Sequence, residues 1–316
     1  MTTINNKDPH RGRLGQIPIY LGKFFRMFIY VNDWKVLPMA AIIAGLVAKV
    51  AATNMCKTQE GTIFGALALA CICVWNGCFN SIQVVCRERD IVKREHRDGM
   101  HISSYICAHM IYQAFLCLCQ TVITIVVCRF IGLAFPTTGC ITPYFNIDLG
   151  ITIFLATYAA DMLALMISSM VRNTTSAMTV MPFVLIFQLL FSGAMFGLEG
   201  FAKKITSLSI AKWTINALCM QSGYNDLPMV TVWNQMKKFR GIEVSGYTPV
   251  DTFMDYLQSN GNAQNLTQWM GGHNQNAEYV LSAANLASAW MYLLLFAAIF
   301  AVAAILFLEK IDHDKR

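Results

Sequence analysis

Long apolar runs alternate with mostly short polar segments along this chain. Six of the runs come close to the ~20 residues that a helix needs to cross the hydrocarbon core of a bilayer. The pattern therefore predicts an all-α integral membrane domain over residues 36–308. Its six transmembrane helices are expected at 36–55, 62–86, 104–131, 149–171, 177–197 and 287–308.

The segment before the first apolar run, residues 17–35, is amphipathic. Lys23 and Arg26 share one side of the helix that it would form. Large apolar side chains share the other side: Phe24, Phe25, Phe28 and Ile29. This pattern predicts a connecting helix that lies at the membrane interface. Residues 1–16 and 309–316 are polar and are expected to form tails at the two ends.

A long segment, residues 198–286, separates the fifth and sixth predicted helices. Its first part, 198–222, is semi-apolar and is expected near the outer membrane face, whereas 225–286 is polar and looks like a small external cap. The distribution of Lys and Arg sets the orientation. With the N-terminus inside, fifteen cations lie on the cytoplasmic side and two lie in the short outer loops. Both termini are therefore predicted to be cytoplasmic, in the plasma (cytoplasmic) membrane, with the long loop outside.

Composition agrees with a membrane protein. The 316 residues are 56% hydrophobic and 13% charged, whereas soluble domains average about 25% charged residues. The formal charge of +6 needs no nucleic acid to explain it, because the cations lie where membrane topology favours them. Most of the eleven cysteines lie in or beside apolar runs, where cysteine acts as a small hydrophobic residue. No metal site is expected.

An island of charge interrupts the apolar pattern between the second and third predicted helices. Residues 87–97 hold five cations and three anions. A charge stranded in the bilayer costs at least ~2.5 kcal/mol, so the island must lie in the cytoplasm. Its composition alone fits either a solvated turn or a short helix that docks a soluble partner.

The chain lacks the motifs of a self-contained enzyme. The sequence contains no P-loop, no GxSxG and no HExxH, and no catalytic residue is predicted. Asp161 is the only acidic residue well inside a predicted span, and His109 lies in the third span. A helix–helix hydrogen bond is the simpler interpretation of Asp161, and substrate or proton handling is the alternative. His109 is expected to be packed and hydrogen-bonded.

Four stretches, taken in order, resemble the membrane domain of ABC transporters of subfamily G, the pleiotropic-drug and sterol exporter group. The resemblance covers residues 17–308, and Lys212 and Trp213 stand where the family usually has Arg and Tyr. The matching stretches are Asn76-Gly77-Cys78-Phe79; Glu88-Arg89, Arg94-Glu95, Gly99 and Tyr105; Phe191-Ser192-Gly193; and Ser209-Ile210-Ala211-Lys212-Trp213 with Ala217-Leu218.

The resemblance implies sites for coupling, substrate and gating. The charged island would be a coupling helix that contacts the ATPase through Arg87, Glu88, Arg89, Lys93, Arg94, Glu95 and Arg97. Glu88 and Glu95 could also brace it against the amphipathic helix. The substrate slot would use Asn76, Phe79 and Asn80 of the second span, with Thr179, Phe183, Phe187 and Leu190 of the fifth. The gate would be Ala194, Met195 and Phe196, softer than the family's paired leucines.

The resemblance also implies partners. The unit would pair with a second copy or a homologous permease, among membrane lipid. Family members usually carry the nucleotide-binding domain on the same polypeptide, but this sequence begins just before the amphipathic helix. We therefore expect ATP and Mg on a separate P-loop ATPase subunit, as in a prokaryotic exporter, and no cofactor on this chain. The external loop lacks the family's cysteines.

The expected function is that of a permease subunit which exports hydrophobic or amphipathic substrates by alternating access. Export of a glycan or lipid-linked polymer is an alternative, although such permeases generally have smaller external loops. A lipid-modifying enzyme with Asp161 and His109 as acid and base, or a receptor that binds a ligand through 225–286, are alternatives of other classes.

Overall fold

In the part of the chain that the computed structural model describes, the regular secondary structure is helical, apart from an isolated antiparallel bridge between Val244 and Tyr247. The described residues are 12–30, 33–51, 54–133, 135–195, 200–227, 236, 238–259 and 276–310. Their helices are α1 (Arg13–Tyr30), η1 (Asp33–Lys35), α2 (Val36–Ala51), α3 (Gln59–Ser81), α4 (Val84–Arg87), α5 (Arg89–Arg97), α6 (Ile102–Ile131), α7 (Phe145–Met170), α8 (Thr174–Leu190), α9 (Gly200–Thr206), α10 (Ile210–Gln221), η2 (Tyr224–Asp226), α12 (Pro249–Ser259), η3 (Ala277–Tyr279) and α14 (Ala283–Glu309).

Within the described residues, four helical segments are long and apolar enough to cross a membrane. They are Gln59–Arg87, Ile102–Ile131, Phe145–Met170 and Ala283–Glu309. The first and fifth predicted spans correspond to α2 and α8, which are apolar but have only 16 and 17 residues. A 17-residue helix is about 26 Å long, somewhat less than the ~30 Å hydrocarbon core.

Helix α8 is shorter than the predicted span 177–197. It begins after Asn173, whose side-chain oxygen accepts a hydrogen bond from the backbone N–H of Ser176 at 2.8 Å. It ends at Leu190, and Gly193 follows with a φ of +78°. This left-handed conformation suits glycine and turns the chain away from the helix axis.

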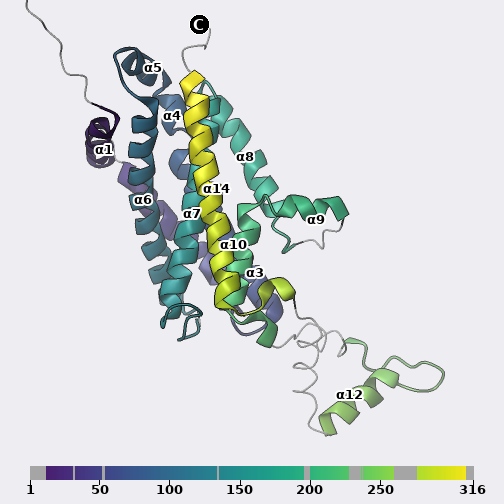
Figure 1. Cartoon of the computed structure of the whole chain (residues 1–316). Coiled ribbons are helices and arrows are strands. Elements are labelled where there is room, and N and C mark those ends of the chain that lie inside the picture. The colour runs from purple at the N-terminus through teal and green to yellow at the C-terminus, as the bar shows by residue number, and fades with distance from the viewer. Residues whose placement is uncertain are drawn as a thin grey trace, which may run out of the picture.

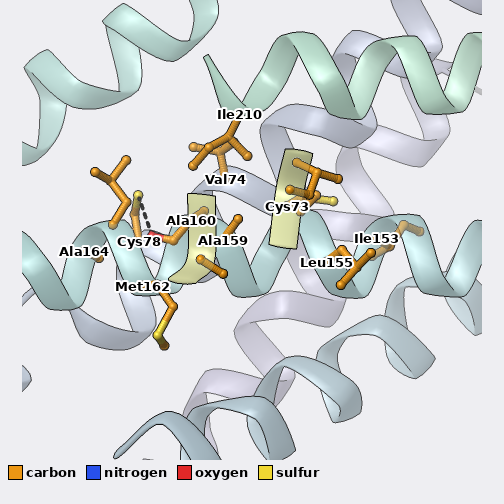
Figure 2. Packing of buried hydrophobic residues seen from close by; sticks show 14 of the residues in the cluster. Cys73, Val74, Cys78, Ile153, Leu155, Ala159, Ala160, Met162, Ala164 and Ile210 are labelled. Carbon is orange, nitrogen blue, oxygen red and sulfur yellow. Dashed lines mark hydrogen bonds between the residues drawn. The ribbon is translucent and has the colours of Figure 1, made fainter. Parts of the chain in front are cut away.

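The centre of the molecule is the contact between α3 and α7. Gly77 of α3 lies against the backbone of α7, where an added Cβ would come within 2.3 Å of the carbonyl oxygen of Thr157. Alanines line the facing part of α7, and Figure 2 shows the Cys78 thiol directed toward the carbonyl oxygen of Ala160. Small residues allow membrane helices to approach closely and gain dispersion contacts along their length.

The semi-apolar segment after α8 is more deeply packed than the sequence predicts. Most side chains of α10 are buried, between α3, α7 and α14. Trp213 of α10 stacks on Tyr292 of α14, with ring centroids 3.9 Å apart. Gln221 of α10 and Trp290 of α14 both donate to the hydroxyl of Thr152, at 2.7 and 2.8 Å. These contacts join the last described helix to the α3–α7 core.

The two ends of the helix bundle differ in character. Figure 1 shows α4, α5 and the C-terminal end of α14 at one end, and α12 at the other.

The aromatic face of α1 packs against the first half of α6, where Phe24 is only 3% exposed. The expected amphipathic helix 17–35 corresponds to α1, which starts earlier, at Arg13, and ends earlier, at Tyr30, while Asp33–Lys35 form the separate helix η1.

Candidate functional site

The charged island forms two short helices, α4 and α5, beyond the end of α3. The chain leaves α3 at Ile82 and turns. The hydroxyl oxygen of Ser168, near the end of α7, accepts hydrogen bonds from the backbone N–H groups of Val85 and Cys86, both at 3.1 Å. Because these N–H groups belong to the first turn of α4, they would otherwise lack partners. The turn from α3 into the island is therefore held by α7.

Glu88 lies at the inner side of the island and is only 8% exposed. One of its carboxylate oxygens accepts a hydrogen bond from the ammonium group of Lys23 on α1 at 3.3 Å. The same oxygen accepts a longer one, 3.5 Å, from the hydroxyl of Tyr105 on α6. A buried carboxylate is stable only when it is paired in this way.

Glu95 makes a second contact with α1. Its carboxylate accepts a hydrogen bond from the hydroxyl of Tyr20 at 3.0 Å. Burial, together with the negative charge of Glu95, raises the pKa of Tyr20 well above its usual value. The phenol therefore remains a proton donor to the carboxylate. Gln16 extends the contact by donating to the carbonyl oxygen of Gly99 at 3.1 Å. The expected bracing of Glu88 and Glu95 against the amphipathic helix is present.

Arg89 ties the island to α7. Its guanidinium donates to the carbonyl oxygens of Ser169 and Val171, both at 3.0 Å. These carbonyls lie at the C-terminal end of α7, where backbone oxygens have no partner within the helix. A cation at this end also interacts favourably with the helix dipole.

The outer face of α5 is exposed and mostly charged. Glu88, Val92 and Glu95 point inward at helical spacing, and Val92 is fully buried. Ile91 and Arg94 lie on the outer face, and Ile91 is 42% exposed. The seven predicted coupling residues therefore divide by orientation. Glu88, Arg89 and Glu95 hold the island in place; Arg87, Arg94 and Arg97 are exposed; and Lys93 is half-buried.

Two of the predicted slot residues on α3 face the protein interior rather than open space. Asn76 is 5% exposed. Asn80 exchanges two hydrogen bonds with the amide of Gln120 on α6, at 2.9 and 3.0 Å. Phe79, between them, is 51% exposed. The α3 part of the predicted slot is thus one projecting ring beside two amides, of which Asn80 is fixed by a neighbouring helix.

The predicted slot residues on α8 are largely exposed. Phe183 is 70% exposed and Leu190 is 41% exposed. Phe187 is half-buried and packs on Phe191, with ring centroids 4.8 Å apart. Thr179 is exposed, and its hydroxyl donates to the carbonyl oxygen of Thr175 on the same helix. These side chains form an apolar surface on one subunit rather than an enclosed pocket.

The predicted gate is described only in part. Ala194 is half-buried and Met195 is 48% exposed, directly after the turn at Gly193. Phe196 lies outside the described residues. The side chain at the end of α8 that is best fixed is Gln188, whose oxygen accepts from the hydroxyl of Ser209 at 2.9 Å and from the N–H of Ala211 at 3.2 Å.

Sequence reasoning missed a polar stripe along α6. Gln113, Cys117, Gln120 and Thr124 recur at intervals of four, three and four residues, and all are buried. The amide of Gln113 donates to the Ser81 hydroxyl at 2.8 Å. The helical spacing of these polar residues within an apolar run was a signal that could have revealed this buried face.

The stripe on α6 also reaches Asp161 of α7, whose carboxylate accepts from the thiol of Cys117 at 3.5 Å. This contact agrees with a helix–helix hydrogen bond as the role of Asp161. His109 belongs to a different cluster, stacked on Phe24 with centroids 3.8 Å apart and edge-on to Tyr105. In contrast to the expectation from sequence, neither ring nitrogen of His109 has a hydrogen-bond partner among the described residues. Asp161 and His109 therefore share no interaction that would support acid–base chemistry.

In the described part of the chain, no three His, Cys, Asp or Glu residues are grouped so as to hold a metal ion. No curated protein matches the sequence. Residues 23–221, more than half of the chain, match the family described as ABC-2 type transporter. The matched range contains α5 and both helices of the predicted slot. The chain therefore belongs to the ABC-2 type transporter family, as a multi-pass membrane subunit of an ABC transporter.

Proposed function

We propose that this subunit exports hydrophobic or amphipathic substrates by alternating access, in the manner of subfamily G. Two membrane units would form one transporter, and each would rest on a separate P-loop ATPase subunit that binds ATP and Mg. ATP-binding subunits are the general partners of ABC-2 type membrane domains. In this proposal α2 and α8 complete a six-span bundle, with both termini and α5 on the cytoplasmic side.

The observation that carries the proposal is the division of α5 into an anchored face and an exposed face. Lys23–Glu88, Tyr20–Glu95 and the contacts of Arg89 with α7 fix the inner face at three points. A partner that pushes on the outer face would therefore move α1 and α7 together with α5. A solvated turn would need no such anchoring, so the geometry favours a docking element.

The chemistry of the outer face also suits a protein partner. Arg87 and Arg94 present guanidinium groups, which form strong, charge-assisted hydrogen bonds with carboxylates. Ile91 places an apolar side chain between them on an exposed, otherwise charged surface. A rim of charge around a small apolar centre is the usual composition of a protein interface.

The apolar surfaces of α3 and α8 support the assignment of the substrate class. Phe79 and Phe183 are exposed rings, whereas the amides of Asn76 and Asn80 on α3 face the protein interior. If a second unit faces this surface, the two copies would enclose an apolar slot with few polar groups. Such sites bind flat or amphipathic molecules mainly through apolar contact.

The proposal is tested by purifying the tagged chain in mild detergent from its native host and identifying the proteins that accompany it. We expect a stoichiometric P-loop ATPase. The double variant I91E/R94E should lose it, because the change removes the apolar centre and reverses a charge on the outer face. The matched control K203E/K204E reverses two exposed charges on α9 and should retain it.

Two results would contradict the proposal. One is the absence of an ATPase from a wild-type preparation that preserves the membrane complex. The other is an ATPase that binds I91E/R94E as well as the wild-type chain, since that would place the docking surface elsewhere.

A further inference from the structure

A cavity of about 340 Å³ lies between α2, α3 and α8. It is partly open, and its size is within the range of small-ligand pockets in proteins. Ile43 and Val47 line it from α2, Ala68 and Cys71 from α3, and Leu189 from α8. None of the seven predicted slot residues is in its lining, so the cavity is distinct from the predicted substrate slot.

The walls of the cavity are almost entirely carbon. Among the described residues that line it, Gln188 is the only one with a side-chain amide. The oxygen of this amide already accepts hydrogen bonds from Ser209 and Ala211. Water enters a buried cavity only where it finds two or more polar partners, and apolar cavities stay dry and take up apolar ligands. Because the walls are otherwise apolar, they favour an apolar occupant over a polar one.

We infer that the cavity binds one hydrocarbon chain of a bilayer lipid. Helices α2, α3 and α8 are apolar and lie within the matched membrane domain. The inference rests on the proposed six-span bundle, in which lipid tails reach the opening wherever a second unit does not cover it. An empty apolar cavity of this size would lose dispersion contacts along all its walls. A single acyl chain restores them without any polar group to desolvate.

The dimensions favour an acyl chain over a second copy of this protein. A helix with its side chains is about 10–12 Å across, too wide to enter a space of this volume between three helices. A second copy could cover the opening but could not fill the cavity. An acyl chain is narrow and flexible enough to enter through the open side.

A bound acyl chain would affect the position of α8 in particular. Among the described residues of α8, only Ala177, Met181 and Gln188 are buried. Leu185 and Leu189 of α8 line the cavity. A bound chain would fill the space between α8 and the α2–α3 pair and hold α8 in its present position. The bound lipid would therefore be a structural component of the subunit.

The test uses the complete transporter in phosphatidylcholine vesicles that contain a trace of phosphatidylcholine with a diazirine on one acyl chain. After illumination, labelled peptides are located by mass spectrometry. Labelling of the segments around Cys71 and Leu189 should saturate as the probe fraction rises, because one site fills. Labelling of the exposed α14 surface near Leu295 should rise in proportion to the probe, because lipids there exchange freely.

Variants that fill the cavity make the test specific. Ala68 is half-buried and lines the cavity, so A68W should remove the saturable labelling. The matched control A298W makes the same change on the exposed side of α14 and should leave it intact. L189W fills the cavity from α8 and replaces A68W if that variant does not fold.

Stability supplies a second readout that does not depend on transport. Removing lipid should lower the melting temperature of the wild-type chain more than that of A68W, because the indole replaces the acyl chain. Labelling that rises in proportion to the probe at both places, or saturable labelling that persists in A68W and L189W, would overturn the inference. So would a cross-link from the cavity to a second copy of the chain in place of lipid.

Discussion

At the scale of single residues, Gly77 has the least space of the glycines in the membrane helices. A Cβ at this position would lie 2.3 Å from the Thr157 carbonyl oxygen and 2.7 Å from the Asp161 backbone nitrogen. Backbone atoms cannot move aside as a flexible side chain can. We therefore expect G77A to force α3 and α7 apart and to lower the free energy of unfolding by about 1–3 kcal/mol.

The measurement for G77A is thermal unfolding of the purified protein, followed by the fraction that remains monodisperse. The matched control is G45A, because a Cβ at Gly45 meets only a side-chain carbon of Val127, at 3.8 Å. The control should unfold at the wild-type temperature or slightly above it. Equal unfolding temperatures for G77A and G45A would show that the two helices have more freedom than this packing implies.

The hairpin that leads into α12 provides a prediction about pH. Asp251 accepts hydrogen bonds from the guanidinium of Arg240 at 2.8 Å and from the N–H of Gly241 at 2.7 Å. Both hold the pKa of Asp251 below its usual value. The ionised carboxylate is thus the form that the hairpin stabilises. Its contribution is complete above the unfolded pKa, about 3.9, and is lost as pH falls through the lower pKa of the folded hairpin.

We expect the amide of Gly241 to lose protection from hydrogen exchange as pH falls below about 4, after correction for the intrinsic rate. In D251N, the neutral amide oxygen is a weaker acceptor than the carboxylate, so the protection of Gly241 should be low. It should also be the same at every pH, because the side chain does not titrate. Protection in the wild type that does not change across this pH range would mean that Asp251 does not hold the turn.

At the scale of elements, the contact between α1 and α5 depends on Lys23 and Glu88. The carboxylate is buried, while the side chain of Lys23 is 33% exposed. A double-mutant cycle with K23M and E88Q should give a coupling free energy in unfolding of about 0.5–3 kcal/mol. K23M combined with the distant D251N should be additive. If K23M and E88Q were additive as well, the pair would not join the two helices energetically.

The charge density of the island within an apolar chain predicted that it leaves the bilayer, and the family resemblance, not composition, predicted that it forms a helix. The charge pattern alone did not predict which of its residues point inward, although the bracing of Glu88 and Glu95 against the amphipathic helix was expected. Glu88 and Arg94 look alike as members of a charged run, yet Glu88 is buried against α1 and α6 while Arg94 is exposed. That difference arises from Lys23 and Tyr105, which lie far away in the sequence.

The ends of the helices were predictable where composition changes and not where a single residue turns the chain. The predicted third and sixth spans, 104–131 and 287–308, correspond closely to α6 and α14. The fifth span was expected to continue to 197, because the residues beyond Leu190 are mostly apolar. The left-handed Gly193 turns the chain there instead, and hydropathy carries no signal for that conformation.

At the scale of the whole molecule, the fold separates a closely packed centre from a sparsely packed side. Helices α3 and α7 meet through Gly77 and small residues of α7, whereas α8 exposes Phe183 and Ile186. Sequence pattern predicted the all-α membrane class. The cavity beside α8 was not predictable, because it depends on how three helices diverge rather than on any one of them. The proposed dimer and the proposed lipid site both involve this sparsely packed side.

The central claim is that the outer face of α5 contacts an ATPase, and chemical cross-linking tests it most directly. R94C in native membranes is labelled with a maleimide–benzophenone reagent, which attaches to the thiol and, on illumination, forms a bond to a C–H group of any protein in contact. T138C, in the exposed loop at the opposite end of the bundle, is the matched control, and the wild-type chain gives the background from the native cysteines. We predict that R94C is joined to a P-loop ATPase and that T138C is not. A cross-linked ATPase from T138C alone, or none from R94C in membranes that contain the assembled complex, would contradict the account.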